Sequence, residues 1–323
     1  CGFPPDLLQY TGQEEQTVYY FIINPQSRSG AALAIWRRLG KTLTDNHIRY
    51  HRFFTRYRGH AAVLAARLSD HTGSRDVIAV LGGDGTLNEV INGLKDPARR
   101  TLAYIPTGSG NDFARGMGMK TDFSRGIPPL FRSGTIRRLD ICQCQTDRIS
   151  KRFVISSGLG FDAAICHEAL HSPLKKALNK IRAGKLTYTF LALRQLISFH
   201  PFCLQLITDN GRKRTFENVY FIAAMNLKYE GGGFQFCPQA SADDGYLDLF
   251  LIHGMSKLKI LLLLPTAFFG LHTRFKGVEI IRCQKAEFLA DRPLPVHIDG
   301  ESAGVSARVR VSVLREQPRI LSG

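Results

Sequence analysis

Residues 82–89 read Gly-Gly-Asp-Gly-Thr-Leu-Asn-Glu, and the rest of the chain is interpreted outward from this stretch. An apolar run at 76–81, typical of a buried strand, precedes it, and apolar residues at helical spacing follow from Leu87 to Leu94. Glycines between a strand and a helix let backbone N–H groups approach an anion, and the helix N-terminus adds favourable partial charge. A single helix cap would explain Asp84 or Thr86 alone, but not three glycines around an aspartate. The sequence therefore predicts a phosphate-binding turn.

Two further turns have the same setting. Residues 106–114 read Pro-Thr-Gly-Ser-Gly-Asn-Asp-Phe-Ala after a strand-like run at 101–105. Residues 24–30 read Asn-Pro-Gln-Ser-Arg-Ser-Gly after another such run at 18–23. In an open α/β sheet, ligands bind beyond the carboxyl ends of the strands, where all of these turns would lie. Three equivalent turns predict a nucleotide-binding site.

Strands and helices alternate over residues 18–135. Besides the strands before the glycine turns, the pattern indicates a helix at 31–43, a strand at 50–54 and a helix at 61–68. Such alternation is typical of a parallel sheet with helices on both faces. The sequence predicts a doubly wound α/β nucleotide-binding domain at 18–135.

The pattern changes over residues 136–316, where strands dominate and helices are expected only at 183–199 and 257–271. Many strands separated by glycine turns predict a mostly antiparallel β-sandwich. We expect the C-terminal strands to return toward the cleft between the two domains. The expected strands lie at 153–157, 202–208, 219–224, 246–252, 278–288 and 305–314.

Composition limits the partners of the chain. It has 323 residues, of which 44% are hydrophobic, and a net charge of +16 that favours anionic partners. The basic stretch at 175–185 spreads its charges around a helix instead of forming one stripe, so no nucleic-acid partner is predicted. The longest apolar run, at 260–271, is shorter than the roughly 20 residues of a membrane span and contains Pro265. Residues 1–17 have no signal-peptide core, and seven cysteines without metal-ligand spacing indicate reduced thiols. We expect a cytoplasmic protein, soluble or peripheral to a membrane.

The three turns together resemble the catalytic domain of the diacylglycerol kinase family, which includes soluble bacterial lipid kinases and the sphingosine and ceramide kinases. The resemblance runs from about residue 19 to about residue 314. Gly-Gly-Asp-Gly is also similar to motifs of NAD kinases and phosphofructokinases. The Gly-Asn-Asp-Phe-Ala-Arg turn at 110–115 is what favours the lipid kinases.

The resemblance implies an ATP- and Mg²⁺-dependent lipid kinase that converts diacylglycerol to phosphatidic acid. It further implies a lipid substrate at an anionic membrane surface, the inner face of the cytoplasmic membrane, and leaves a homodimer open. The alternatives are a sphingoid-base kinase, an NAD kinase, and a regulator that binds nucleotide or lipid without catalysis.

Phosphoryl transfer needs a held nucleotide, a cation on the phosphates and a group that takes the hydroxyl proton. The glycine turns predict the nucleotide site, and the resemblance adds Thr55, which touches the nucleotide in the family. The predicted nucleotide-binding residues are Asn24, Thr55, Gly83, Asp84, Gly85, Thr86, Leu87, Asn88, Glu89 and Ser109.

Three aspartates end strands or lie at the hinge: Asp84, Asp112 and Asp140. In the family, the equivalent aspartates form a water and metal network. The alternative roles are helix caps for Asp84 and Asp112, and an ion pair of Asp140 with Arg137 or Arg138.

A structural cation is implied near the Asp-Asp-Gly turn at 243–245, which by default is only a hairpin turn. In soluble bacterial diacylglycerol kinases, a similar segment wraps Mg²⁺ with one carboxylate and backbone carbonyls, the oxygen ligands that a hard cation prefers. The resemblance thus implies Asp244 as a ligand, with the carbonyls of Ser241 and Tyr246.

Glu301 closes the stretch His-Ile-Asp-Gly-Glu at 297–301, also by default a hairpin turn. The family places its general base at this glutamate, and burial against lipid would raise the pKa of such a carboxyl. Glu301 is therefore the expected catalytic base. Asp84 is the competing candidate, because the sphingosine kinase branch assigns the role to that aspartate.

Overall fold

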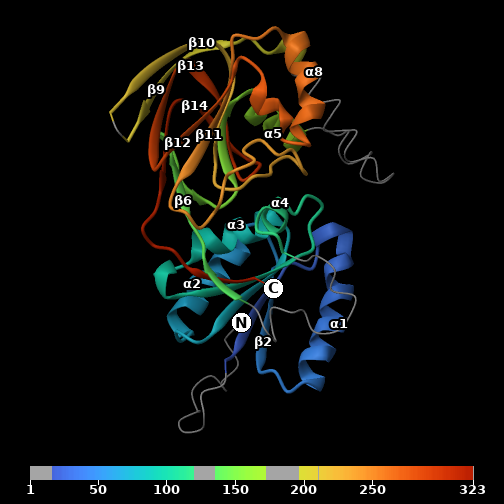
Figure 1. The fold of residues 1–323 in the computed structure, drawn as a ribbon. Helices are drawn as coiled ribbons and strands as arrows, with labels where there is room; N and C mark the ends of the chain where they lie inside the picture. The colour runs from blue at the N-terminus through green and yellow to red at the C-terminus, as the bar shows by residue number, and fades with distance from the viewer. Residues whose placement is uncertain (1–16, 120–134, 172–195, 210, 323) are drawn as a thin grey trace.

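The computed structural model describes residues 17–119, 135–171, 196–209 and 211–322. An α/β domain and a larger β-rich domain are stacked, with α3 (Asp84–Gly93) and α4 (Asp112–Gly116) at the boundary between them (Figure 1). The two-domain fold class expected from the sequence is confirmed.

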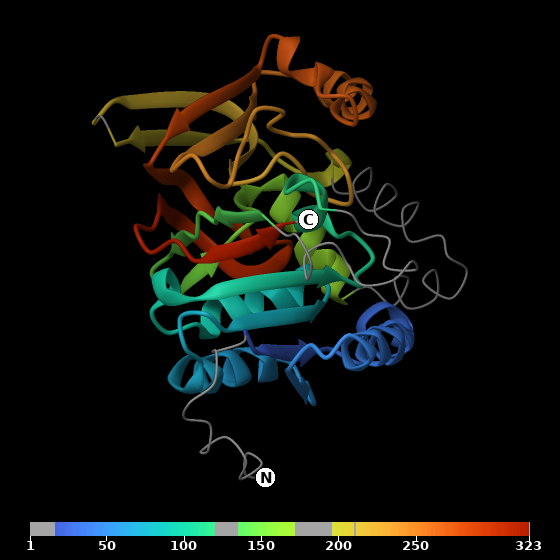
Figure 2. The ribbon, with the colours of Figure 1, turned by 60° about the horizontal axis from the view of Figure 1, so that its bottom comes forward.

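The sheet of the α/β domain has six strands in the order β2-β1-β3-β4-β15-β5 (Figure 2). The first five run parallel to their neighbours, and β5 is antiparallel to β15 at the edge. The strands are β1 (Tyr19–Ile23), β2 (Tyr50–Phe54), β3 (Val77–Gly82), β4 (Thr101–Pro106), β5 (Thr135–Arg138) and β15 (Arg319–Ser322).

Helices cover both faces of this sheet because its central strands are buried on both sides. In β1, Tyr20 and Ile22 pack on the face of α2 (His60–His71) and α3. Phe21 and Ile23 point to the opposite face, which α1 (Ala31–Asp45) covers (Figure 1). Alternate residues of one apolar strand thus pack against helices on opposite faces of the sheet.

The second domain is built on a nine-stranded sheet in which every strand pair is antiparallel. Among its described residues, two α-helices accompany the sheet, α5 (Phe161–His171) and α8 (Lys257–Ala267). Its strands are β6 (Cys142–Gln145), β7 (Ser150–Phe153), β8 (Ser156–Gly160), β9 (Phe202–Thr208), β10 (Lys213–Met225), β11 (Leu247–His253), β12 (Val278–Cys283), β13 (Lys285–Ile298) and β14 (Glu301–Val313).

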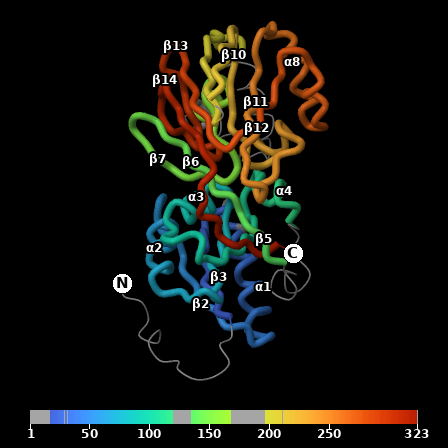
Figure 3. Tube along the Cα trace, turned by 60° about the vertical axis from the view of Figure 1, so that its left-hand side comes forward, coloured from blue at the N-terminus to red at the C-terminus, as the bar shows by residue number. Residues whose placement is uncertain are grey.

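The chain passes between the domains twice, from β5 to β6 and from β14 to β15 (Figure 3). The two crossovers are hydrogen-bonded to each other: Leu139 N–H donates to the Pro318 carbonyl at 2.9 Å, and Leu314 N–H donates to the Ile141 carbonyl at 2.8 Å. The last strand, β15, therefore belongs to the first domain's sheet although it ends the chain.

Some expected elements differ from the observed ones. The expected strand at 278–288 is two strands, β12 and β13, and the expected helix at 257–271 ends as α8 at Ala267. The expected helix at 183–199 lies mostly outside the described residues, as does the basic stretch at 175–185. Among the described helices, none combines the length and the apolar character needed to cross a membrane.

Candidate active site between the two domains

The three glycine turns meet at the carboxyl edge of the parallel strands. An added Cβ at Gly108 would lie 2.8 Å from the Cα of Gly83, so these two turns approach closely through bare backbone. In chain order, the first turn (24–30), the second (82–89) and the third (106–114) are in contact here. Ser27 Oγ of the first donates to the Thr107 carbonyl of the third at 2.9 Å, and Thr107 Oγ1 donates to Ser27 Oγ at 3.0 Å. The structure thus gathers the three turns at one edge of the sheet, and the binding of a phosphate chain by their backbone stays a prediction.

Asp84 stands at the first position of α3, but its carboxylate does not cap that helix. It accepts the backbone N–H groups of Asp112 at 3.0 Å and Phe113 at 3.4 Å, and the Tyr104 hydroxyl at 3.2 Å. Burial and then the neighbouring Asp112 carboxylate raise the pKa of Asp84 to about 6. The aspartate thus ties the second glycine turn to the third and holds a readily protonated carboxyl beside them.

Asp112 connects the third turn to the β-rich domain. Its carboxylate pairs with Arg115 at 2.6 Å and accepts the backbone N–H of Gly232 at 2.8 Å. Burial raises the pKa of this carboxyl, and these hydrogen bonds oppose the shift. The first two aspartates of the expected network therefore lie together.

The residues after Gly85 face away from the turns. Leu87 is fully buried in the domain core. Asn88 donates to Asp299 Oδ2 at 2.7 Å, and Glu89 accepts the backbone N–H groups of Gly59 and Ala61 at the start of α2. These side chains support the elements around the site, and their contact with a nucleotide stays a prediction.

The other predicted nucleotide residues surround the turns. Asn24 Nδ2 donates to Thr86 Oγ1 at 3.0 Å, which fixes the end of β1 to the start of α3. Thr55 follows β2, with its backbone N–H bound to the Ile23 carbonyl at 2.8 Å, and Ser109 is exposed. Their roles toward a nucleotide likewise stay predictions.

Glu301 reaches the glycine turns from the opposite domain. An added Cβ at Gly85 would lie 3.7 Å from Glu301 Oε1, and the side chain of Glu301, 43% exposed, pairs with Arg58 at 2.5 Å. Its position is set by Asp299, whose buried carboxylate accepts Asn88 Nδ2 and the backbone N–H groups of residues 154–156. The structure therefore brings both candidate bases to the same glycine turn: Asp84 belongs to it, and Glu301 of the β-rich domain lies beside its Gly85.

The Asp-Asp-Gly turn lies beside the crossovers. Asp244 accepts the Tyr246 backbone N–H at 3.0 Å and pairs with the guanidinium of Arg282. Asp140, fully buried, accepts the Gly245 backbone N–H at 2.8 Å. The carboxylates and backbone carbonyls of this turn are the oxygen ligands that a hard cation prefers. The residues therefore fit the implied Mg²⁺, provided that the Arg282 side chain moves away from the Asp244 carboxylate.

The alternative role of Asp140 is wrong. Arg137 pairs with Asp243 at 2.7 Å, and the hydrogen-bond partners of the Asp140 carboxylate are Gly245 and the side chain of Gln317. Asp140 lies in the first crossover and binds both the Asp-Asp-Gly turn and Gln317 of the second crossover. The aspartate therefore joins both crossovers to the expected cation site.

A buried cluster around His297, four residues before Glu301, was not predicted. His297 Nε2 lies 2.9 Å from Asp162 Oδ2 and 3.1 Å from Glu230 Oε1. A methyl group at Gly158 would collide with Asp162 and His297, so a bare glycine makes room for the cluster. These side chains have the chemistry to hold a divalent cation, and in its absence their charges balance best with a proton on the imidazole.

Protonation of this cluster follows from its surroundings. Burial by itself lowers the pKa of His297, but the carboxylates of Glu230 and Asp162 outweigh it and raise the value to about 9. Burial raises the pKa of Glu230 to about 7, and the charge of His297 opposes the shift. Only His297 within the 297–301 stretch gave a signal in the sequence, since its partners come from distant segments.

Two family models cover most of the chain. The diacylglycerol kinase catalytic domain matches residues 18–144, and the YegS C-terminal NAD kinase beta sandwich-like domain matches residues 158–322. The chain is 31% identical to YtlR of Bacillus subtilis, which is named as a lipid kinase, over 89% of this chain and 94% of that protein. It is 29% identical to a diacylglycerol kinase of Mycobacterium tuberculosis, over 77% of this chain and 79% of the relative.

Solved structures agree in fold. A diacylglycerol kinase from Bacillus anthracis superposes with a TM-score of 0.70 at 19% sequence identity, covering 97% of this chain and 98% of that one. The glycine turns, the facing aspartate and glutamate, and the two matching domains lead to one conclusion. The chain belongs to the diacylglycerol kinase catalytic family of lipid kinases.

Proposed function

We propose that the protein transfers the γ-phosphoryl group of ATP to the hydroxyl of diacylglycerol, forming phosphatidic acid. The observation that carries this proposal is the position of Glu301, which belongs to the β-rich domain and lies beside Gly85 in the glycine turn of the α/β domain. A nucleotide on the turns would present its γ-phosphate to an acceptor held by the opposite domain. Mg²⁺, when bound, would neutralise charge on the phosphates and leaving group.

Each residue has a defined task in this reaction. The acceptor hydroxyl attacks the γ-phosphorus, the bond to the β-phosphate oxygen breaks, ADP leaves, and Glu301 takes the hydroxyl proton. Arg58, paired with Glu301 at 2.5 Å, orients that carboxylate. Asp84 and Asp112 hold the glycine turns in register, which positions the nucleotide before any chemistry occurs.

Lipid access is supported by an apolar surface on α8 and the segment after it. Leu258, Leu262 and Phe269 are 66%, 68% and 76% exposed. Phe268 stacks on Phe234 with ring centroids 4.2 Å apart, so this surface adjoins the loop that contacts Asp112 through Gly232. We propose that α8 inserts into the headgroup region of the cytoplasmic leaflet of an anionic membrane. The net charge of +16 would strengthen this docking.

Glutamine at position 301 tests the reaction. Glu301→Gln keeps the size of the side chain but loses the proton acceptor, so turnover should fall by about 10²–10⁴-fold with little change in the KM for ATP. Glu217→Gln, at an exposed position of β10, is the matched control and should keep full activity. Near-normal turnover of Glu301→Gln, beside an inactive Asp84→Asn with unchanged ATP and Mg²⁺ affinity, would move the base to Asp84.

The acceptor is the open part of the proposal. Sphingoid bases and NAD are the rival acceptors, and a regulator without activity is the rival outside enzymes. Label transfer to each acceptor in turn separates these functions. A homodimer would show as a molar mass in solution that rises toward twice that of the chain as the protein concentration is increased.

A further inference from the structure

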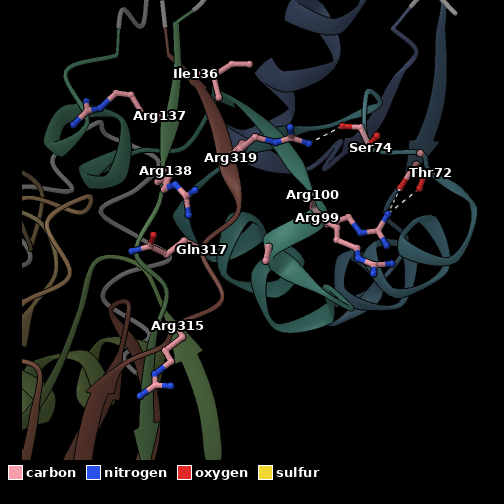
Figure 4. A pocket seen from close by; sticks show the side chains of 12 residues that line it. Thr72, Ser74, Arg99, Arg100, Ile136, Arg137, Arg138, Arg315, Gln317 and Arg319 are labelled. Atoms are coloured by element: carbon pink, nitrogen blue, oxygen red, sulfur yellow. Dashed lines mark hydrogen bonds between the residues drawn. The ribbon is translucent and has the colours of Figure 1, made fainter.

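An arginine-lined cavity lies on the side of the α/β domain away from the glycine turns. It has a volume of about 780 Å³, and six of its twelve lining residues are arginines (Figure 4). The loops that begin β3 and β4 form one wall, whereas the glycine turns follow the carboxyl ends of the same strands. The other wall is formed by β5, by the start of β15 and by the second crossover, which leads into β15. The lining arginines are Arg99, Arg100, Arg137, Arg138, Arg315 and Arg319.

Some of these arginines have fixed positions. Arg100, nine-tenths buried, donates to the Thr72 carbonyl at 2.8 Å and to the Lys95 carbonyl at 3.3 Å. Arg319 donates to the Ser74 carbonyl at 2.6 Å, while its Nε is buried without a hydrogen-bond partner among the described residues. These guanidinium groups are held by neutral carbonyls, so their charges stay uncompensated.

Other arginines of the cavity are unpaired. Within the described part of the chain, the side chains of Arg99, Arg138 and Arg315 form no ion pair or hydrogen bond. Figure 4 shows Arg138 and Arg315 on the crossover side and Arg99 on the opposite side. Of the six, Arg137 alone has a carboxylate partner in the described residues, Asp243, which does not line the cavity.

Nearby acidic groups are already engaged. Asp76 accepts the backbone N–H of Gly73 at 2.7 Å, and Glu316 lies 3.9 Å from Arg152. No described lining residue is acidic. Like charges held around one hollow repel one another, and an anion in the hollow relieves that repulsion.

We propose that this cavity is a second anion site, separate from the nucleotide site, for a phosphate monoester with two negative charges. Guanidinium groups bind phosphate oxygens through paired N–H donors, and a cluster of them favours a multiply charged phosphate over a carboxylate. The volume is that of a small-molecule pocket, so an organic group attached to the phosphate also fits. The ligand is either the headgroup of an anionic phospholipid or a soluble phosphate compound.

Binding there would act on the hinge. A ligand would bridge the α/β domain, through Arg99 and Arg100, to the end of β5, through Arg138, and to the second crossover, through Arg315. Gln317, another lining residue, donates to the buried Asp140 that holds the Asp-Asp-Gly turn. The cavity is thereby connected to the expected cation site, and a bound phosphate would restrain how the two domains move relative to each other.

Titration with inorganic pyrophosphate tests the proposal. In Arg138→Ala/Arg315→Ala, which removes two exposed and unpaired guanidinium groups, affinity should fall tenfold or more. Arg37→Ala/Arg38→Ala, at exposed positions of α1, removes the same charge elsewhere and should stay within twofold of the wild type. Wild-type binding should persist in Gly83→Val, which blocks the glycine turn.

Flotation with phosphatidylcholine vesicles, with and without phosphatidic acid, identifies the source of the phosphate. If Arg138→Ala/Arg315→Ala loses affinity for pyrophosphate but still binds phosphatidic acid vesicles, the ligand is a soluble phosphate compound. If the same variant loses binding to phosphatidic acid vesicles but keeps its affinity for pyrophosphate, the ligand is a lipid headgroup. If both double variants lose affinity equally, or the cavity variant loses none with either probe, the site does not exist. If the wild type binds neither probe, the proposal is equally overturned.

Discussion

Replacing His297 by glutamine removes a buried positive charge from between two carboxylates. His297 is fully buried, and its Nε2 lies within hydrogen-bond distance of both Asp162 and Glu230. The pKa of His297 rises from 6.5 to about 9 in the folded protein. At 1.36 kcal/mol per pKa unit, this shift corresponds to about 3 kcal/mol of stabilisation by the carboxylates. Breaking a buried ion pair by removing one partner typically costs about 3–5 kcal/mol, which agrees.

Urea denaturation followed by far-UV circular dichroism measures this effect. His297→Gln should lower the free energy of unfolding at pH 7 by about 3–5 kcal/mol. The double variant His297→Gln/Glu230→Gln should recover about half of the loss, because it removes one unpaired carboxylate together with the cation. Glu230→Gln alone leaves the imidazolium–Asp162 pair intact and should cost less than His297→Gln.

The pH dependence has a defined sign. Because the folded pKa of His297 lies above the unfolded value, its stabilisation is complete below about pH 6.5 and is lost as pH rises through about 9. The raised pKa of Glu230 likewise makes stability fall as pH rises toward about 7. Wild-type stability should therefore decline between pH 7 and pH 9.5, and the double variant should be flatter. Additive costs in the double variant, or equal pH slopes in both proteins, would refute an ionic role for the cluster.

Three other predictions concern the glycine turns, the Asp-Asp-Gly turn and the charge of Asp84. Gly108→Ala should weaken ATP binding about tenfold or more, because its Cβ would lie 2.8 Å from the Gly83 Cα. Gly40→Ala in α1, where the nearest atom to the added Cβ is Trp36 Cζ2 at 3.5 Å, should leave ATP titrations unchanged. Asp244→Ala should lower both the melting temperature and turnover without rescue by excess Mg²⁺, and identical melting with and without chelator would argue against a structural cation there. Turnover should fall as pH drops below about 6, where Asp84 gains a proton, and a flat acid limb in the kinetic profile would show that its charge is not needed.

Local sequence signals predicted the strand, turn and helix around Gly83 correctly. Leu87, Val90, Ile91 and Leu94 have helical spacing after the turn, and all four are buried in the structure. A strand, a glycine turn and a helix are neighbours in the chain, so their geometry is set by short-range rules. The strand, turn and helix around Gly83 could therefore be read from the sequence, whereas its contact with Gly108 of a distant turn could not.

Long-range contacts could not be predicted in the same way. Residues 319–322 form β15 in the first sheet, although such a short strand has no periodicity of its own. The helix α5 is apolar around most of its surface, so it lacked the amphipathic pattern that would have announced it. Glu89 caps α2 and Asp84 binds the start of α4, and nothing local in the sequence specifies these partners. Side chains that join distant segments need the fold before their role can be assigned.

Transfer of label from γ-labelled ATP to lipids in mixed micelles tests the central claim most directly. The wild type should be compared with Glu301→Gln on separate samples of diacylglycerol, sphingosine, ceramide and NAD. The proposed function predicts labelled phosphatidic acid from diacylglycerol with the wild type, and a product reduced by about 10²–10⁴-fold with the variant. Label in NAD alone, or no labelled lipid from a folded wild type that binds ATP and Mg²⁺, would contradict it.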